Sequence, residues 1–231
     1  MALIYAHRGA SGYAPENTVA SFDLALEMHA DGIETDVRAT RDGVLVLLHD
    51  AGVDRTTDGK GAIAELTFEQ VKRLDAGSHF SPAHAAQRVP SLDDFLDRYA
   101  GRTKFWLEIK AAGIERAAVD AVRQRRLDDD VAFTSFNCGS LEAVRQASSA
   151  ASLTYLIREL QPDTIERSRG IGVSQLSIHH STLTTDVVRA VRDRGLDVRT
   201  WGISDKETLR RMLGLGLYGL TLNWPDWVAE E

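Results

Sequence analysis

Short runs of β-branched, aromatic and apolar residues alternate with amphipathic helical patterns along the 231-residue chain. Eight runs are expected to be strands: Leu3–His7, Ile33–Arg38, Phe105–Ile109, Val131–Ser135, Leu153–Ile157, Gln175–His179, Asp197–Trp201 and Gly219–Asn223. Strand–helix units that recur every 20 to 30 residues or so are typical of a parallel sheet. Eight such units in about 230 residues favour a single-domain α/β protein, a (β/α)8 TIM barrel spanning residues 1–231, over an open sheet.

The segments between the strands show the spacing of helices with one buried face. From Thr18 to Ala30, for example, Val19, Phe22 and Leu26 fall on one side, and Gly32 follows as a stop signal. Several of these segments begin after Ser, Thr or Asp, which are favoured helix caps. Further helices are expected at Ser91–Tyr99, Ile114–Arg125, Ser140–Ala147, Thr185–Arg194 and Ser204–Leu213.

The run Val44–His49 interrupts this alternation. It follows the second expected strand too closely for a parallel crossover, and Asp42-Gly43 is a strong hairpin signal. If these two residues form the turn, Asp36 pairs with His49. Residues from about 51 to 89 exceed the length of one connecting helix, so we expect a small insertion there, with a helix near Thr67–Leu74.

Acidic residues end the second and third expected barrel strands, where active sites of such barrels lie. Glu34 and Asp36 alternate and so share a face, and Glu108 ends the next strand. A Glu-x-Asp pattern alone also fits solvated acids on a half-exposed strand. Carboxylates that point into a barrel repel one another, however, and a hard divalent cation would neutralise them. The hairpin pairing would bring His49 to the same face. We therefore interpret Glu34, Asp36 and Glu108 as metal ligands.

Basic and imidazole side chains complete a set suited to phosphodiester cleavage. Arg8 follows His7 at the end of the first strand, and Lys110 follows Glu108 by two residues. Arg8 and Lys110 can bind phosphate oxygens, Arg8 through a bidentate fork. Two imidazoles, His7 and His49, can divide the base and acid roles. The sequence leaves open which histidine takes which role.

The composition limits the partners that we expect. The net charge is −7, with 43% hydrophobic and 26% charged residues, so nothing indicates binding to nucleic acid or to an anionic membrane. No apolar stretch approaches the roughly 20 residues of a membrane span, and the first residues do not resemble a secretory signal. Cys138 is the only cysteine, which excludes an intrachain disulfide and suits a cytoplasmic protein. Self-association into a homo-oligomer is left open.

These residues belong to longer motifs that resemble the glycerophosphodiester phosphodiesterase family. The opening run His7–Thr18 resembles the signature at the start of that family. Later matches cover nearly the whole chain: Glu34–Val37, Thr40–Gly43, His49–Asp50, Arg55–Gly59, Leu74–Gly77, Val89–Leu92, Leu107–Lys110, Ser135–Asn137 and Thr200–Trp201.

The resemblance implies a TIM barrel with a small insertion, a bound Mg2+ or Ca2+ ion, and hydrolysis of glycerophosphodiesters to sn-glycerol 3-phosphate and an alcohol. Carried over residue by residue, it implies the acid and base roles for His7 and His49. The implied metal ligands are Glu34, Asp36 and Glu108, and the implied phosphate contacts are Arg8 and Lys110. Phe136 and Trp201 would line the glycerol side.

The last block departs from the family pattern. Tyr218 and Asn223 stand where the family usually has acids, and Gly202-Ile203-Ser204 follows Trp201 in place of a Val-Asn start. These positions lie outside the implied catalytic set, so the departures concern substrate preference and the last strand. Three alternatives are a lysophospholipase D-like phosphodiesterase, a non-catalytic phosphoester-binding barrel and a metabolic barrel isomerase. The acidic charge disfavours the first, the retained histidines the second, and the concentration of chemistry in the first three strands the third.

Overall fold

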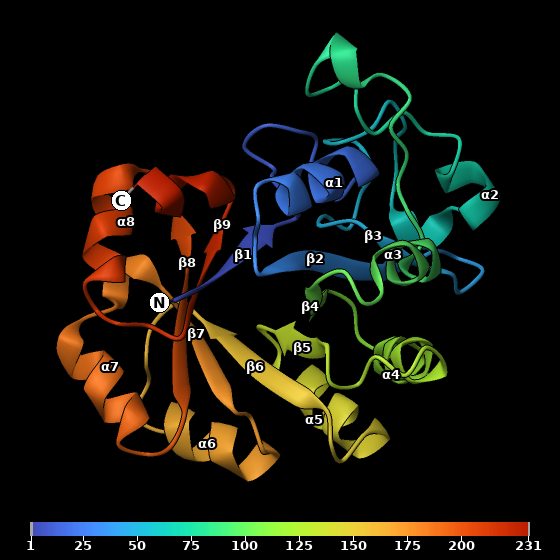
Figure 1. Cartoon of the computed structure of the whole chain (residues 1–231). Coiled ribbons are helices and arrows are strands. Elements are labelled where there is room, and N and C mark those ends of the chain that lie inside the picture. Colours follow the sequence, from blue (N-terminus) through green and yellow to red (C-terminus); the bar gives the residue numbers. More distant parts are fainter. Residues whose placement is uncertain (1, 231) are drawn as a thin grey trace.

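The computed structural model of the chain describes residues 2–230 and folds its strands into a closed parallel barrel (Figure 1). The sheet runs β1-β9-β8-β7-β6-β5-β4-β2, and parallel pairing of β1 with β2 closes it, while β3 lies antiparallel on β2. The predicted (β/α)8 barrel is therefore confirmed. The strands are β1 (Leu3–His7), β2 (Gly32–Ala39), β3 (Leu45–Leu47), β4 (Lys104–Ile109), β5 (Val131–Ser135), β6 (Ser152–Ile157), β7 (Gln175–His179), β8 (Asp197–Ile203) and β9 (Gly219–Leu222).

Helices surround the barrel, and no helix among residues 2–230 is long and apolar enough to cross a membrane. The sequence pattern does not predict α6, whose Thr, Ser and Gly residues have weak helix propensity. The α-helices are α1 (Val19–Glu27), α2 (Phe68–Val71), α3 (Leu92–Tyr99), α4 (Glu115–Gln124), α5 (Cys138–Ala147), α6 (Thr164–Ile171), α7 (Thr185–Arg192) and α8 (Lys206–Leu213). Short 3-10 helices lie at Ile63–Glu65, Pro82–His84, His180–Thr182 and Pro225–Glu230.

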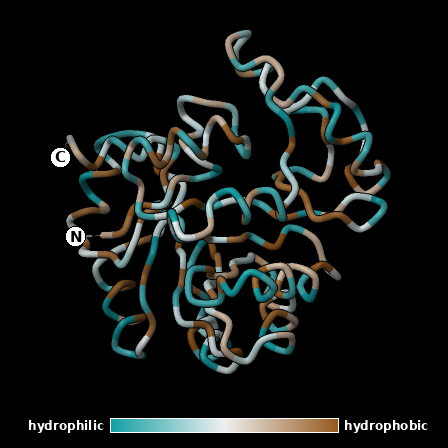
Figure 2. Tube along the Cα trace, turned by 45° about the vertical axis from the view of Figure 1, so that its right-hand side comes forward, coloured by the Kyte–Doolittle hydropathy of each residue, from teal (hydrophilic) through white to brown (hydrophobic). Residues whose placement is uncertain are grey.

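The alternation of side chains on β4 shows how the barrel is built. Phe105, Leu107 and Ile109 point outward into the hydrophobic layer beneath the helices, whereas Trp106 points inward and packs on Tyr5. Figure 2 shows the matching pattern on the outer helices, where hydrophobic and hydrophilic residues alternate along each coil. Such helices bury one face against the sheet. Because the outward side chains pack beneath the helices, the inward side chains at the strand ends can be polar and can form a site.

The hairpin between β2 and β3 differs from the prediction by one residue. The observed pairs are Val37 with Leu47 and Arg38 with Val46, and the Thr40 N–H donates to Val44 O. The turn thus contains three residues and ends at Gly43, whose φ of 82° suits glycine. The predicted pairing of Asp36 with His49 is therefore wrong, because a glycine in the left-handed region lengthens the turn by one residue.

The insertion at about 51–89 carries its own small core. The expected helix is present in shortened form as α2, between two of the 3-10 helices. Figure 1 shows the segment, coloured cyan to green, on the side of the barrel that holds α1 and β3. Five of its buried apolar residues form one cluster with Val46 of β3 and with Leu48, which directly follows β3: Val53, Ile63, Val71, Ala76 and Val89.

Candidate active site

Three carboxylates meet at the carboxyl ends of β2 and β4. Glu34 and Asp36 alternate on β2 and share a face, and Asp36 lies beside Glu108 in the parallel register of the two strands. Glu34, Asp36 and Glu108 are only 6%, 0% and 7% exposed. One carboxylate oxygen from each lies within 4.8 Å of the other two. The structure therefore brings the three predicted metal ligands together.

Buried carboxylates at this spacing resist simultaneous ionisation. Burial raises the pKa of Glu34 well above its usual range, and the neighbouring Asp36 and Glu108 raise it further. Burial and Asp36 raise the pKa of Glu108 to about 7, although Lys110 opposes this change. Burial also acts to raise the pKa of Asp36, but Arg8 and Lys110 outweigh it and leave that pKa below its ordinary value. The residues present therefore supply too little positive charge for three ionised carboxylates.

The donor set fits a hard divalent cation. All three side chains offer oxygen ligands, which Mg2+ and Ca2+ prefer. Asp36 Oδ1 accepts no hydrogen bond from any residue between 2 and 230, and Lys110 Nζ approaches it only to 3.6 Å. A cation at this point would fill the unused acceptor and relieve the repulsion that shifts the carboxyl pKa values.

Two basic side chains border the acidic cluster. Lys110 Nζ donates to Glu108 Oε1 at 2.9 Å. Arg8 Nε lies 3.0 Å from Asp36 Oδ2, and Arg8 Nη1 donates to Glu16 Oε1 at 3.0 Å. The Arg8 backbone adopts a φ of 58°, which an L-residue rarely does, and its N–H donates to Glu34 O at 2.8 Å. Arg8, the residue predicted to bind phosphate, thus also forms ion pairs with two carboxylates.

His7 ends β1 and faces the pocket beside Glu34. Its Nδ1 lies 2.6 Å from Asn223 Oδ1, which also accepts a hydrogen bond from Ser11 Oγ, and its Nε2 lies 3.9 Å from Glu34 Oε2. Burial, and then the charge of Arg8, lower the pKa of His7 to about 4. Asn223 is not among the predicted site residues, but the structure places it in direct contact with His7.

His49 reaches the same pocket from the loop after β3. The chain leaves the ladder beyond Leu48, so strand alternation no longer decides which way His49 points. Its carbonyl oxygen accepts from Arg38 Nε at 2.9 Å, and its Nδ1 lies 2.7 Å from Asp50 Oδ1. Burial lowers the pKa of His49, while the nearby Asp36 works in the opposite direction. The expected neighbourhood of His49 is present, although the register used to predict it is wrong.

A chain of ion pairs links the two histidine-bearing segments. Arg55 donates from Nε to Asp50 Oδ2 at 2.5 Å and from both terminal nitrogens to Glu16 at 2.8 Å. Glu16 in turn pairs with Arg8, so the series runs from His49 through Asp50, Arg55 and Glu16 to Arg8. Sequence analysis assigns no role to Asp50, Arg55 or Glu16. Their position inside the family motifs was the available signal.

Asn17 is a further residue without a predicted role. Its Nδ2 donates to Asp36 Oδ2 at 2.9 Å, and its Oδ1 accepts from Thr35 Oγ1 at 2.7 Å. The side chain is buried, and its backbone adopts a φ of 55°, a region that Asn tolerates better than most residues. Asn17 therefore orients one of the three clustered carboxylates.

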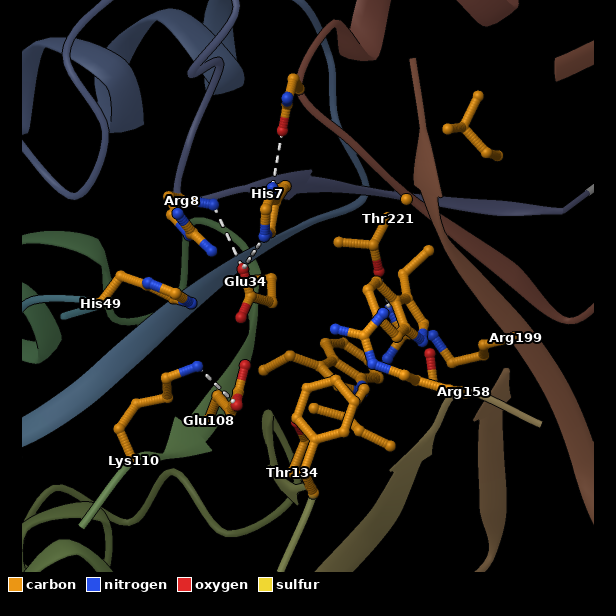
Figure 3. A pocket seen from close by; sticks show the side chains of 18 of the residues that line it. His7, Arg8, Glu34, His49, Glu108, Lys110, Thr134, Arg158, Arg199 and Thr221 are labelled. Carbon is orange, nitrogen blue, oxygen red and sulfur yellow. Dashed lines mark hydrogen bonds and ion pairs between the residues drawn. The ribbon is translucent and has the colours of Figure 1, made fainter. Parts of the chain in front are cut away.

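The later strands form the opposite wall of a pocket of about 300 Å³. Phe136 and Trp201, both predicted to line the site, contact each other with ring centroids 5.2 Å apart. Arg158 lies over the Trp201 ring at 5.7 Å from its centroid. Figure 3 shows Arg158 and Arg199 across the pocket from Lys110 and His49.

Arg199 is 1% exposed and lies inside the barrel, between the rings of Tyr5 and Trp106 at 4.1 and 4.5 Å. Its Nη2 donates to Thr221 Oγ1 at 3.2 Å, and burial lowers its pKa to about 10. Neither Arg158 nor Arg199 is among the predicted site residues. Arg158 directly follows an expected strand, and Arg199 alternates with Trp201, so the rule applied to the first strands would have found both.

Comparison with known proteins agrees with this geometry. The model of the Glycerophosphoryl diester phosphodiesterase family matches residues 7–227. A glycerophosphodiester phosphodiesterase of Caldanaerobacter subterraneus is 32% identical over 230 residues, covering 97% of this chain and 95% of that protein. A solved glycerophosphodiester phosphodiesterase from Agrobacterium tumefaciens has a TM-score of 0.90 at 28% identity, with 100% of each chain covered. A phosphodiesterase of Oleispira antarctica, solved with the product sn-glycerol-3-phosphate, has a TM-score of 0.89 at 28% identity and covers 99% of this chain and 95% of its own.

Proposed function

This chain belongs to the glycerophosphoryl diester phosphodiesterase family, and we propose that it hydrolyses glycerophosphodiesters to sn-glycerol 3-phosphate and an alcohol. The observation that carries the proposal is the buried carboxylate cluster beside two histidines and two basic residues, all at one end of a barrel. The Oleispira enzyme, of similar fold, was solved with sn-glycerol-3-phosphate, which supports the same product class here.

Glu34, Asp36 and Glu108 would hold one divalent cation, Mg2+ or Ca2+. Bound there, the ion would neutralise charge that develops on the phosphoryl oxygens. Lys110 and Arg8 would add positive charge on the same side of the phosphate. Arg8 is held by Glu16 and Asp36, so it is oriented before the substrate arrives.

The hydrogen bonds of the two histidines favour different roles. The Asn223 oxygen beside His7 Nδ1 favours a proton on that nitrogen, which leaves Nε2 as an acceptor. His7 would therefore take the proton from the attacking hydroxyl as the new P–O bond forms. Asp50 beside His49 Nδ1 stabilises a charged imidazolium. His49 would donate its Nε2 proton to the alcohol oxygen as the old P–O bond breaks.

Phe136 and Trp201 would line the glycerol moiety, since their rings contact each other in the lining of the pocket. The attacking hydroxyl can belong to the neighbouring carbon of that glycerol, giving a cyclic phosphate that water then opens, or to water directly. In both routes His7 Nε2 would accept the proton of the attacking hydroxyl. We place the enzyme in the cytoplasm, which the single, buried Cys138 supports.

The test is the release of sn-glycerol 3-phosphate from glycerophosphocholine, glycerophosphoethanolamine and glycerophosphoglycerol by the purified protein. Reactions would contain Mg2+, Ca2+ or EDTA, with a His49→Ala variant in parallel. We expect turnover with at least one metal, loss in EDTA and a strong decrease in the variant. The proposal would be refuted by a protein that binds these metals yet leaves every diester intact.

A further inference from the structure

The two walls of the pocket differ in how their charges are compensated. Glu34 and Glu108 are the only carboxylates among the described residues that line it, and both belong to the wall of β2 and β4. Arg8 and Lys110 lie in ion pairs with that acidic cluster. On the opposite wall, Arg158 and Arg199 form no ion pair with any carboxylate in residues 2–230. That wall therefore carries positive charge that no described carboxylate neutralises through an ion pair.

Arg158 is the accessible member of this pair. It follows the last residue of β6 and is exposed, whereas Arg199 is buried at the floor of the pocket. The guanidinium of Arg158 makes no hydrogen bond to any described residue; it lies over the Trp201 ring, near His179. A guanidinium over an aromatic face does not use its N–H donors for that contact, so they can bind an acid group.

The position of Arg158 also limits what the open side of the pocket can accept. The alcohol of a glycerophosphodiester varies in size, so it has to extend toward solvent, where Arg158 lies. A choline or ethanolamine group would bring a cation toward Arg158 without meeting a carboxylate on that wall.

We propose that Arg158 selects glycerophosphodiesters whose alcohol group carries an acid, either a carboxylate or a phosphate. This inference rests on the proposed function and adds a substrate class to the same site. The diester phosphate is bound by the wall of β2 and β4, and the second acid group of the substrate binds Arg158. Arg158 is thus a specificity-determining residue, separate from the residues that move protons.

Two matched substrate pairs test the inference. Glycerophosphoserine and glycerophosphoethanolamine differ by one carboxylate, and glycerophosphoglycerol 3-phosphate and glycerophosphoglycerol differ by one phosphate. We expect kcat/KM to be about three- to tenfold higher for the acidic member of each pair, as for a partly exposed charge-assisted hydrogen bond. The two arms also show whether a carboxylate or a phosphate is preferred. The advantage should shrink as salt is added.

The variant Arg158→Gln should abolish the advantage of the acidic member. Arg189→Gln is the matched control, because it removes the same charge from α7, where Arg189 pairs with Asp186 outside the pocket lining. It should retain the advantage. Equal kcat/KM within both pairs in the wild type, or an advantage that survives Arg158→Gln, would overturn the inference. If no diester of either pair were hydrolysed, the proposed function would fail, and this inference with it.

Discussion

The pocket wall built by β1, β2 and β4 differs from the wall built by the later strands in how many of its charged groups form ion pairs. On the first wall, nearly every charged group has a partner: Arg8 with Asp36 and Glu16, and Lys110 with Glu108. On the second, Arg199 contacts two aromatic faces and one hydroxyl, Arg158 contacts an aromatic face, and neither forms an ion pair with a described carboxylate. A preorganised wall suits bond cleavage, because its dipoles need no rearrangement as charge develops. The looser wall suits recognition of a variable group.

The largest effect should come from the histidines of the first wall. We expect His7→Ala and His49→Ala each to lower kcat by about 10² to 10⁴, the usual contribution of a positioned acid or base. The rate constant would be measured with glycerophosphoserine at saturating metal. Circular dichroism and metal titration of each variant serve as controls for folding. A variant that keeps more than half of the wild-type kcat would remove that histidine from the mechanism.

The next largest effect concerns the support of Asp36. Asn17→Gly removes the hydrogen bond to Asp36 Oδ2 and keeps a residue that accepts the φ of 55°. Loss of a group that orients a metal ligand typically costs about 10- to 100-fold in metal affinity or activity. Titration with Mg2+ and Ca2+, followed by calorimetry, would measure this. Unchanged affinity would show that the Asp36 carboxylate needs no such support.

A smaller effect should appear when pH is varied. The pKa of Glu108 is about 7 and that of Glu34 is raised, so the metal-free cluster holds protons at neutral pH. A cation has to displace these protons, so its apparent affinity should rise with pH, by about tenfold per pH unit for each proton released, and level off above the raised pKa values. Calorimetry in buffers of different ionisation enthalpy counts the protons. If the apparent affinity for the cation changed by less than about tenfold between roughly pH 5.5 and 8, the raised carboxyl pKa values would be contradicted.

The smallest effect should be that of Arg158 on stability. Arg158 is exposed and forms no ion pair with any residue from 2 to 230, so Arg158→Gln should change the free energy of unfolding by less than about 0.5 kcal/mol. Urea denaturation measures this directly, with Arg189→Gln as the comparison. If Arg158→Gln lowered the free energy of unfolding by several kcal/mol, Arg158 would be a structural residue, and the contrast between the two walls would not hold.

The sequence predicts the barrel well because its strands follow a simple rule. On β4 the apolar residues Phe105, Leu107 and Ile109 alternate with the inward residues Trp106 and Glu108, and the structure reproduces that alternation. The same rule brings Glu34, Asp36 and Glu108 together. Strand alternation is local, so it survives errors of a residue or two in where elements begin and end.

Positions that depend on turns and loops are less predictable. The Asp36–His49 pairing fails because a three-residue turn ending at Gly43 shifts the register. Asn223 meets His7 only because β1 and β9 are neighbours in the closed barrel, a contact between residues more than 200 positions apart in the chain. The Asp50–Arg55–Glu16 series likewise joins two loops. Such contacts depend on the path of the backbone, which hydrophobic periodicity does not specify.

Whether this protein is a glycerophosphodiester phosphodiesterase is decided by the bond that it cleaves. Glycerophosphoserine would be incubated with the protein and Mg2+ or Ca2+, and the products followed by phosphorus NMR. We expect one new phosphorus signal, that of sn-glycerol 3-phosphate, which is absent in EDTA and strongly reduced with His49→Ala. Formation of phosphoserine, or of inorganic phosphate without sn-glycerol 3-phosphate, would show that the site cleaves a different bond and would refute the proposed reaction.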